Sequence, residues 1–316
     1  MNSPAQIMNE DFSLPVSSRL AFRFSRHLRE RIIEFILFLS ACLAVLTTLA
    51  IVVILVYESI PFFQHVSLKD FLTDTQWTPL FDDAHYGIMP LVSGTLVTTG
   101  VALSVAIPLG TIIAIYLSEF ASHKVREIVK PFLELLGAVP TIVFGYFALV
   151  FVTPLLQSTI LPNLPGFNML SAGLVMGIMI IPYVSSLSED AMHAVPMHMR
   201  EASYAMGATR FQTAFRVVTP AAFSGIAAAY ILGISRAMGE TMVVAVAAGM
   251  QANMTWNPME PAETMTAYIV QVSLGDLPHG SIGYQTIFAV GLTLIFMTLA
   301  FNIMGFLLTR RFRERY

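Results

Sequence analysis

Two ionisable side chains, Arg236 and Glu240, stand inside an otherwise apolar stretch that runs from Ala221 to about Met250. A charge in the middle of a membrane helix costs about 2.5 to 3.5 kcal/mol, so charges that persist there tend to be functional. A planar guanidinium can grip a tetrahedral oxyanion through paired hydrogen bonds, and Thr241 adds a neutral donor next to it. We therefore predict a substrate pathway that contains Arg236, Glu240 and Thr241.

Glu240 would repel the anion that Arg236 attracts, so it needs a different role. The two residues are four positions apart, which places them on one face of a helix, where they can pair. Glu240 could then hold Arg236 in place, release it when a pathway opens, or accept a proton from the anion. The alternative is that the pair is only a structural salt bridge within the membrane.

The second candidate is the segment from Met199 to Pro220, which is too polar to span a membrane. Glu201 to Met206 predicts a short helix, and Gly207 can adopt the left-handed conformation that ends it. Thr209 can cap a second helix that runs to Pro220. The pattern predicts a helix-turn-helix element, although an ordinary loop between two spans explains the same residues on geometry alone.

Several kinds of site are not expected. None of the lysines (Lys69, Lys124 and Lys130) follows a glycine, so the chain lacks a nucleotide-binding phosphate loop. The seven histidines have no metal-ligand spacing, and the single cysteine, Cys42, can form no disulfide within the chain. We expect no catalytic residue, no metal and no cofactor on this chain, and any ATP and Mg²⁺ to bind a partner ATPase.

The composition is that of a membrane protein. Charged residues make up only 12% of the 316 residues, hydrophobic residues make up 56%, and the mean hydropathy is +0.71. A soluble fold of this length would leave much of that apolar surface exposed to water. The net charge of -3 gives no indication of a nucleic-acid partner.

A membrane span needs about 20 apolar residues, and uncharged or nearly uncharged runs of that length predict an all-α polytopic protein with six transmembrane helices. The first predicted span is retained, because the long polar segment before it differs from a cleavable signal. The predicted spans are Phe35 to Tyr57, Ile88 to Ser118, Leu135 to about Leu156, Met169 to Ser188, Ala221 to about Met250, and Ile282 to Thr309.

Basic residues predict the orientation, because cytoplasmic loops retain Lys and Arg. Fifteen of the 17 Lys and Arg residues fall in segments on one side of the predicted membrane, and the opposite loops carry only Lys69. Both termini are therefore expected in the cytoplasm. The opposite loops carry acidic residues instead, namely Glu58, Asp70, Asp74, Asp82, Asp83, Glu260, Glu263 and Asp276.

The predicted organisation has four parts. Residues 1–31 form a cytoplasmic N-terminal segment, and residues 32–87 form the first transmembrane helix with an external loop. Residues 88–309 form the transmembrane core, with a cytoplasmic loop at about 189–220. Residues 310–316 form a basic cytoplasmic tail.

The polar segment resembles the EAA loop of ABC importer permeases. The matching residues are Glu201-Ala202-Ser203, then Gly207, and then Val217 and Pro220 at the family's spacing. Two positions depart from the pattern: Ser203 replaces an alanine, and Thr219 stands where leucine is common. The resemblance implies that Glu201, Ala202, Ser203 and Gly207 couple the chain to an ATPase, because in that family the short helix docks on the ATPase subunit.

Two further segments resemble the permeases of phosphate-specific ABC importers. They are Ser235–Met242, reading Ser-Arg-Ala-Met-Gly-Glu-Thr-Met, and Gly137–Phe147, reading Gly-Ala-Val-Pro-Thr-Ile-Val-Phe-Gly-Tyr-Phe. The valines that follow Met242 are more similar to the C-type (PstC-like) subunit than to the A-type subunit. The resemblance implies the type I, MetI-like permease fold and import of inorganic phosphate.

The resemblance also implies the partners and the location. They are a second permease subunit (PstA-like) in a heterodimer, an ATPase homodimer, a periplasmic phosphate-binding protein and the lipid bilayer of a bacterial inner membrane. Three alternatives remain: a permease for another oxyanion such as sulfate, molybdate or phosphonate, a secondary transporter, or a membrane enzyme. The single charged pair argues against the latter two, which need several intramembrane ionisable groups or a convergent catalytic set.

Overall fold

The computed structural model describes residues 16–79, 81, 83–275, 277–278 and 280–311. The chain divides into two units, Met1–Tyr57 and Glu58–Tyr316, and each is described by itself. The described residues are mainly helical. They contain two isolated β-bridges and no β-strand beyond these bridges. Asp82 and Asp276, and parts of the predicted N-terminal segment and basic tail (1–15 and 312–316), lie outside the described residues.

The first unit contains most of one long helix, α2 (Val16–His65). Its apolar part, Glu30–His65, is long enough to cross a membrane and contains the predicted span from Phe35 to Tyr57. The helix begins earlier than the predicted span, because several of the polar residues before it are good helix formers that hydropathy does not register. It also continues past Tyr57 to His65.

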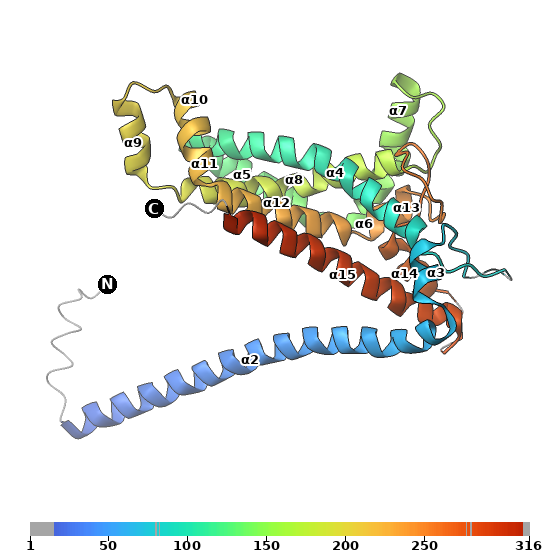
Figure 1. Cartoon of the computed structure of the whole chain (residues 1–316). Coiled ribbons are helices and arrows are strands. Elements are labelled where there is room, and N and C mark those ends of the chain that lie inside the picture. Colours follow the sequence, from blue (N-terminus) through green and yellow to red (C-terminus); the bar gives the residue numbers. More distant parts are fainter. Residues whose placement is uncertain (1–15, 80, 82, 276, 279, 312–316) are drawn as a thin grey trace. The chain divides into compact units, whose positions relative to one another are not determined.

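Long helices that lie side by side form the centre of the second unit (Figure 1). Five helices of the described chain are long and apolar enough to cross a membrane, or six if one bent pair counts as a single span. The described residues therefore support the predicted multi-pass, all-α fold. The central helices are α4 (Met89–Ile115), which continues into the π-helical turn η1 (Tyr116–Phe120), α8 (Met169–His193), α12 (Phe223–Met238) and α15 (Ile282–Arg311).

Two predicted spans are broken. The third was expected from Leu135 to about Leu156, but α5 (His123–Ala138) ends before Pro140 and a new helix begins after it. Proline disfavours helical geometry at the preceding residue and has no amide to donate, which explains the break. The third span instead begins at Thr141 and consists of α6 (Thr141–Phe147), the π-helical turn η2 (Ala148–Val152) and α7 (Thr153–Thr159). Together, Thr141–Thr159 is long and apolar enough to cross a membrane.

The fifth predicted span, Ala221 to about Met250, is also wrong as a continuous helix. Its start is bent by 72° between the segment Arg210–Ala221 and α12. Its end is interrupted after Met238, and α13 (Met242–Ala247) forms a separate short helix. Gly239 is the residue at which α12 ends, and its φ of -88° lies outside the left-handed region that favours glycine.

Helices α4 and α8 pack very closely. A Cβ atom on Gly173 would meet the Val101 side chain at 2.7 Å, and one on Gly177 would meet the Ala102 carbonyl oxygen at 2.7 Å. Small residues with this spacing let helix backbones approach, which is how apolar helices gain contact energy without a hydrophobic driving force between them. The close contact makes α4 and α8 one rigid pair.

A second apolar cluster lies at the end of the second unit that is opposite α9 (Met197–Ala205) (Figure 1). It joins the end of α2, α3 (Leu68–Thr73) and α14 (Met265–Ser273). The Trp77 and Tyr268 rings meet edge to face at 5.1 Å, and the Tyr268 hydroxyl lies 2.6 Å from the Thr286 hydroxyl. Aromatic packing of this kind anchors the predicted external loops on the bundle.

Glu263 departs from the sequence expectation for an external acidic residue. It is only 3% exposed, and its Oε1 atom has no hydrogen-bond partner among the described residues. Its backbone is held against α4, because the next-but-one amide, that of Met265, donates to Thr95 Oγ1 at 3.1 Å. Burial raises the pKa of the Glu263 carboxyl to about 7, because the charged form loses its hydration.

The orientation is tested with single cysteines in a Cys42→Ala background. Thr75 and His123 are both exposed and lie in segments predicted on opposite sides of the membrane. We expect Thr75→Cys to react with an impermeant thiol reagent added outside intact cells, and His123→Cys to react only after the membrane is opened. The reverse labelling pattern would contradict the predicted orientation, and labelling of both from outside would indicate mixed insertion.

The second prediction concerns the pH dependence of stability. The pKa of Glu263 in the folded protein is about 7, above its ordinary value of 4.5. The stabilising contribution of the protonated carboxyl is therefore complete below pH 4.5 and is lost as the pH rises through about 7. We expect this carboxyl to lower the stability of the purified protein as the pH rises from 4.5 to about 7, and Glu263→Gln to remove up to about 3 kcal/mol of that dependence.

Thermal unfolding in detergent measures this effect at several pH values. Glu127→Gln is the matched control, because the Glu127 side chain is 65% exposed and has no burial cost. An unchanged pH dependence in Glu263→Gln would contradict the prediction.

Candidate functional site

Arg236 and Glu240 meet at the break in the fifth span. Arg236 lies in the last turn of α12, and Glu240 follows Gly239, just past the end of the helix. Arg236 Nη1 is 2.8 Å from Glu240 Oε2, with the arginine side chain 32% exposed and the glutamate side chain 2% exposed. The predicted pair is present, although Glu240 lies outside the helix on which it was expected.

Glu240 has a second task that the sequence did not indicate. Its Oε1 atom accepts the backbone amides of Met242 at 3.2 Å and Val243 at 3.4 Å, which are the first residues of α13. A carboxylate at this position satisfies amides that have no partner inside the helix. Glu240 therefore connects the end of α12 to the start of α13, which compensates for burying its charge.

The break is also tied to other elements. Thr266 of α14 donates its hydroxyl to the Glu240 carbonyl at 2.7 Å, and Ser235 donates to Asn302 of α15 at 2.9 Å. The Thr241 hydroxyl donates to the Gly239 carbonyl at 3.3 Å, so in this conformation it serves the turn. These bonds hold Arg236 in a defined place at the surface of the bundle.

The two segments that resemble phosphate permeases lie against each other. Gly145 belongs to α6, and a Cβ atom at this position would meet the Met242 carbonyl oxygen and the Val243 Cα at 3.1 Å. A larger residue at this position would therefore require α6 or α13 to shift by a few tenths of an ångström. Residues about 100 positions apart thus form one local structure around the broken helix.

The polar segment Met199–Pro220 has the predicted helix-turn-helix form and lies at one end of the second unit (Figure 1). Helix α9 ends at Ala205, and Gly207 has a φ of +82°, the left-handed conformation predicted for it. Thr209 accepts the Gln212 amide at 3.3 Å, and the Gln212 side chain accepts the Thr209 amide at 2.9 Å. This capping box starts the second arm, which consists of α10 (Arg210–Thr213), the π-helical turn η3 (Ala214–Val218) and α11 (Thr219–Ala221).

The predicted coupling residues lie on two sides of this element. Glu201 and Ala202 are exposed on α9, and Gly207 is exposed at the turn. Ser203 is half-buried, and its hydroxyl lies 2.8 Å from the Thr213 hydroxyl on the second arm. The serine that departs from the EAA pattern thus joins the two arms, while the outer face stays open to a partner.

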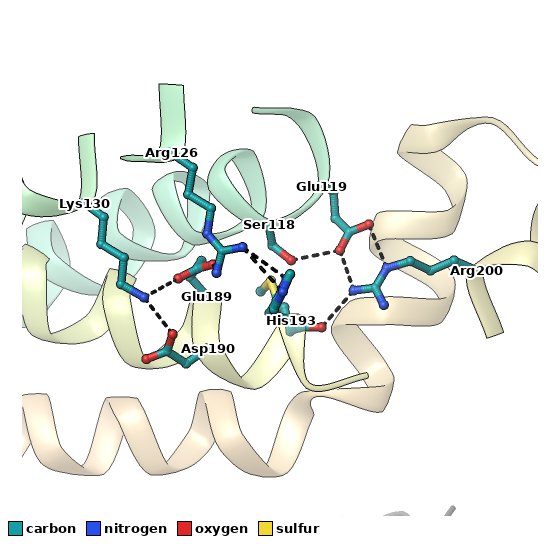
Figure 2. Close-up of polar contacts among 9 residues, drawn as sticks. Ser118, Glu119, Arg126, Lys130, Glu189, Asp190, His193 and Arg200 are labelled. Atoms are coloured by element: carbon teal, nitrogen blue, oxygen red, sulfur yellow. Dashed lines mark hydrogen bonds and ion pairs between the residues drawn. The ribbon is translucent and has the colours of Figure 1, made fainter. Parts of the chain in front are cut away.

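A cluster of charged residues beneath α9 was not predicted (Figure 2). Arg200 of α9 pairs with Glu119 of η1, and the bond from its Nη2 to Glu119 Oε1 is 2.9 Å. Arg126 and Lys130 of α5 pair with Glu189 of α8, and Lys130 also contacts Asp190 at 2.7 Å. These basic residues were interpreted only as topology signals. The partners are 59 to 81 positions apart, so local spacing could not reveal the pairs.

His193 and His198 are both exposed. In addition, Arg126 Nη1 lies 3.3 Å from His193 Nδ1, so His193 is at the edge of the charged cluster. Among the described residues, no group of three or more His, Cys, Asp or Glu side chains is placed to hold a metal ion.

Comparison with solved structures identifies the fold. The chain aligns over 92% of its length with the whole of a chain from a bacterial ABC transporter involved in the import of the acidic polysaccharide alginate, with a TM-score of 0.63 and 16% identity. It also aligns over 72% of its length with 95% of a chain of the MetNI methionine ABC transporter, with a TM-score of 0.53 and 19% identity. The predicted MetI-like permease fold is confirmed.

Sequence relatives extend over most of the chain. A probable ABC transporter permease protein, YqgH of Bacillus subtilis, is 32% identical over 94% of this chain and 97% of its own length. The phosphate transport system permease protein PstC of Mesorhizobium japonicum is 32% identical over 74% of this chain and 76% of its own length. Residues 106–316 match the family described as the binding-protein-dependent transport system inner membrane component. The chain therefore belongs to that family and is a PstC-like permease component of an ABC importer.

Proposed function

We propose that this chain carries inorganic phosphate across a bacterial inner membrane, from the periplasm to the cytoplasm, as one permease subunit of an ATP-driven importer. The observation that carries the proposal is Arg236, the only Lys or Arg between Ala221 and Met250. An anion that leaves water needs a compensating positive charge or donors on its route. Arg236 is 32% exposed and is held in place by Glu240.

The relatives support phosphate as the anion. Proteins named as phosphate transport system permeases are 28% to 32% identical to this chain, and they come from several bacteria. The two segments that resemble phosphate permeases pack together at the start of α13, where Gly145 contacts Met242 and Val243. Sulfate, molybdate and phosphonate are the competing substrates, because a guanidinium can pair with any of these oxyanions.

The partners follow from the same reasoning. A permease without a phosphate-binding loop needs an ATPase, for which we propose a homodimer that holds ATP and Mg²⁺ and docks on α9 through Glu201, Ala202, Ser203 and Gly207. We propose a PstA-like second permease subunit and a periplasmic phosphate-binding protein as the other components. A related alginate transporter has been solved in complex with a substrate-bound periplasmic protein, and its chain aligns with 93% of this one with a TM-score of 0.57.

The pathway is tested by Arg236→Gln in cells that have no other phosphate importer. We expect uptake of radiolabelled phosphate to fall by about 10-fold or more, because the route loses its positive charge. Arg236→Lys should restore uptake only in part, since it keeps the charge but loses the paired donors. Excess sulfate, molybdate or phosphonate that competes better than unlabelled phosphate would favour another oxyanion.

Variants of Glu240 separate a substrate route from a structural pair. Glu240→Gln should reduce uptake less than Arg236→Gln does, because the amide can still accept the α13 amides. The double variant Arg236→Gln with Glu240→Gln should remain inactive at normal membrane abundance. Uptake near the normal level in the double variant would mean that the single changes only left a charge unpaired.

The docking of α9 is tested by Ala202→Arg and Gly207→Pro. Ala202 is exposed on α9, so a long charged side chain there should block close approach of the ATPase without disturbing the fold. Gly207 has a φ of +82°, which proline cannot adopt, so that change should disrupt the turn. Both variants should insert normally and lose uptake by about 5-fold or more, and normal uptake in both would contradict the proposed dock.

A further inference from the structure

Arg200 occupies a position that the proposed function does not explain. We infer that Arg200 and Glu119 form the link through which movement of α9 reaches the transmembrane helices α4 and α8. This inference rests on the proposed docking of an ATPase on α9, and it assigns positioning roles to two residues outside the EAA pattern. The pair lies at the base of the helix-turn-helix element (Figure 2).

The Arg200 guanidinium joins three elements. It forks onto the Glu119 carboxylate, with Nε to Oε2 at 3.3 Å and Nη2 to Oε1 at 2.9 Å. Nη2 also donates to the Met192 carbonyl at 2.8 Å, and Nη1 donates to the Val195 carbonyl at 2.6 Å. Those carbonyls lie in the last turn of α8 and just beyond it. One side chain of α9 therefore binds both η1 and the end of α8.

Burial makes this link stiff. The Arg200 side chain is 10% exposed and the Glu119 side chain is 5% exposed, so water competes little for their hydrogen bonds. A planar fork with both partners fixed allows little change in direction, unlike a single contact through lysine. Displacement of α9 that kept these bonds would have to carry η1 and the end of α8 with it.

The two faces of α9 differ: the inner face is bonded to the rest of the protein, and the outer face is exposed. Arg200 is directed to the core and Ser203, three residues later, bonds to Thr213 on the second arm. Glu201 and Ala202 are exposed between them, on the side left open for a partner. A force applied to the outer face of α9 is thus resisted by the hydrogen bonds of Arg200 and Ser203 on the inner face.

Glu119 is well placed to receive that force. It lies in η1, the π-helical turn that continues α4, and π-helical turns often occur at functional sites. Helices α4 and α8 pack closely at Gly173 and Gly177, so movement of one carries the other. Since α12 packs on both helices, the movement can reach Arg236 through a continuous set of packed elements.

The neighbouring pair of Arg126 with Glu189 provides a matched control. It has the same charges, lies at the same end of the bundle and includes a fully buried glutamate side chain, which Lys130 also contacts at 2.9 Å. It joins α5 to α8 and does not include a residue of α9 (Figure 2). Loss of Arg126 should therefore weaken packing without disconnecting the α9 element.

The test uses the complete importer, purified with its second permease, its ATPase and its binding protein, and reconstituted in vesicles. Phosphate uptake, ATP hydrolysis and the amount of bound ATPase are measured for each protein. The proteins are wild type, Arg200→Gln, Glu119→Gln, Arg200→Lys, Arg126→Gln and the double variant Arg200→Gln with Glu119→Gln. Wild-type uptake tests the proposed function. Uptake per ATP hydrolysed in the variants tests the link.

We expect Arg200→Gln and Glu119→Gln to keep the ATPase bound and hydrolysing ATP, while uptake per ATP falls roughly 5-fold, within the range for changes between coupled sites. The double variant should fall no further than either single change, because both remove the same link. Arg200→Lys should recover part of the loss, and Arg126→Gln should stay close to wild type.

Three results would overturn the inference. The first is unchanged phosphate uptake per ATP hydrolysed in both single variants, and the second is an equal fall in Arg126→Gln. The third is loss of the bound ATPase, with normal uptake per ATP in the complexes that keep it. If Arg200→Gln does not reach the membrane, the uptake per ATP hydrolysed of Glu119→Gln tests the link instead, because this change keeps the size of the side chain and removes one charge. Absence of phosphate uptake in the wild type would instead reject the proposed function.

Discussion

A buried charged side chain needs its counter-charge inside the protein, because burial removes the water that would otherwise stabilise the charge. This constraint determines which elements of the chain are joined. Arg236 is paired with Glu240 at the end of α12, and Arg200 with Glu119 beneath α9. Arg126 and Lys130 are paired with Glu189 between α5 and α8. Loss of the basic partners would leave a buried carboxylate without a counter-charge, so each pair resists separation of its elements.

The break after α12 follows the same logic for the backbone. Irregular backbone at membrane depth is tolerated only where its polar groups find partners in the protein. Glu240 supplies them at the start of α13, and Thr266 satisfies the Glu240 carbonyl from α14. The Glu240 carboxylate that positions Arg236 thus also stabilises the break between α12 and α13. Arg236, which we propose lies on the substrate route, and the break beside it therefore depend on the same side chain.

At the other end of the second unit, rigidity and exposure are combined in one short helix. The inner face of α9 is bonded through Arg200 and Ser203, and the outer face presents Glu201 and Ala202. Gly207 and the capping box of Thr209 with Gln212 fix the angle between the two arms. These bonds connect α9 firmly to the bundle, which is what the proposed coupling to an ATPase requires.

The sequence alone determined the membrane class, the number of candidate spans and the form of the polar loop. These properties depend on local composition: apolar length predicts a span, Gly207 predicts a left-handed turn, and Thr209 predicts a cap, whatever surrounds them. The family resemblance depended on short motifs of the same kind.

Tertiary structure decided the rest, because the remaining features depend on contacts between distant residues. Hydropathy places Pro140 and Gly239 inside apolar runs, but it does not show that the helix breaks at each of them. A break is tolerated only where the freed backbone groups find partners elsewhere in the protein. The charge of Glu263 suggested an exposed residue, and only the packing of its segment against α4 buried it. Arg200 and Glu119 are 81 residues apart, so their pairing exists only because the fold brings the end of α4 beneath α9.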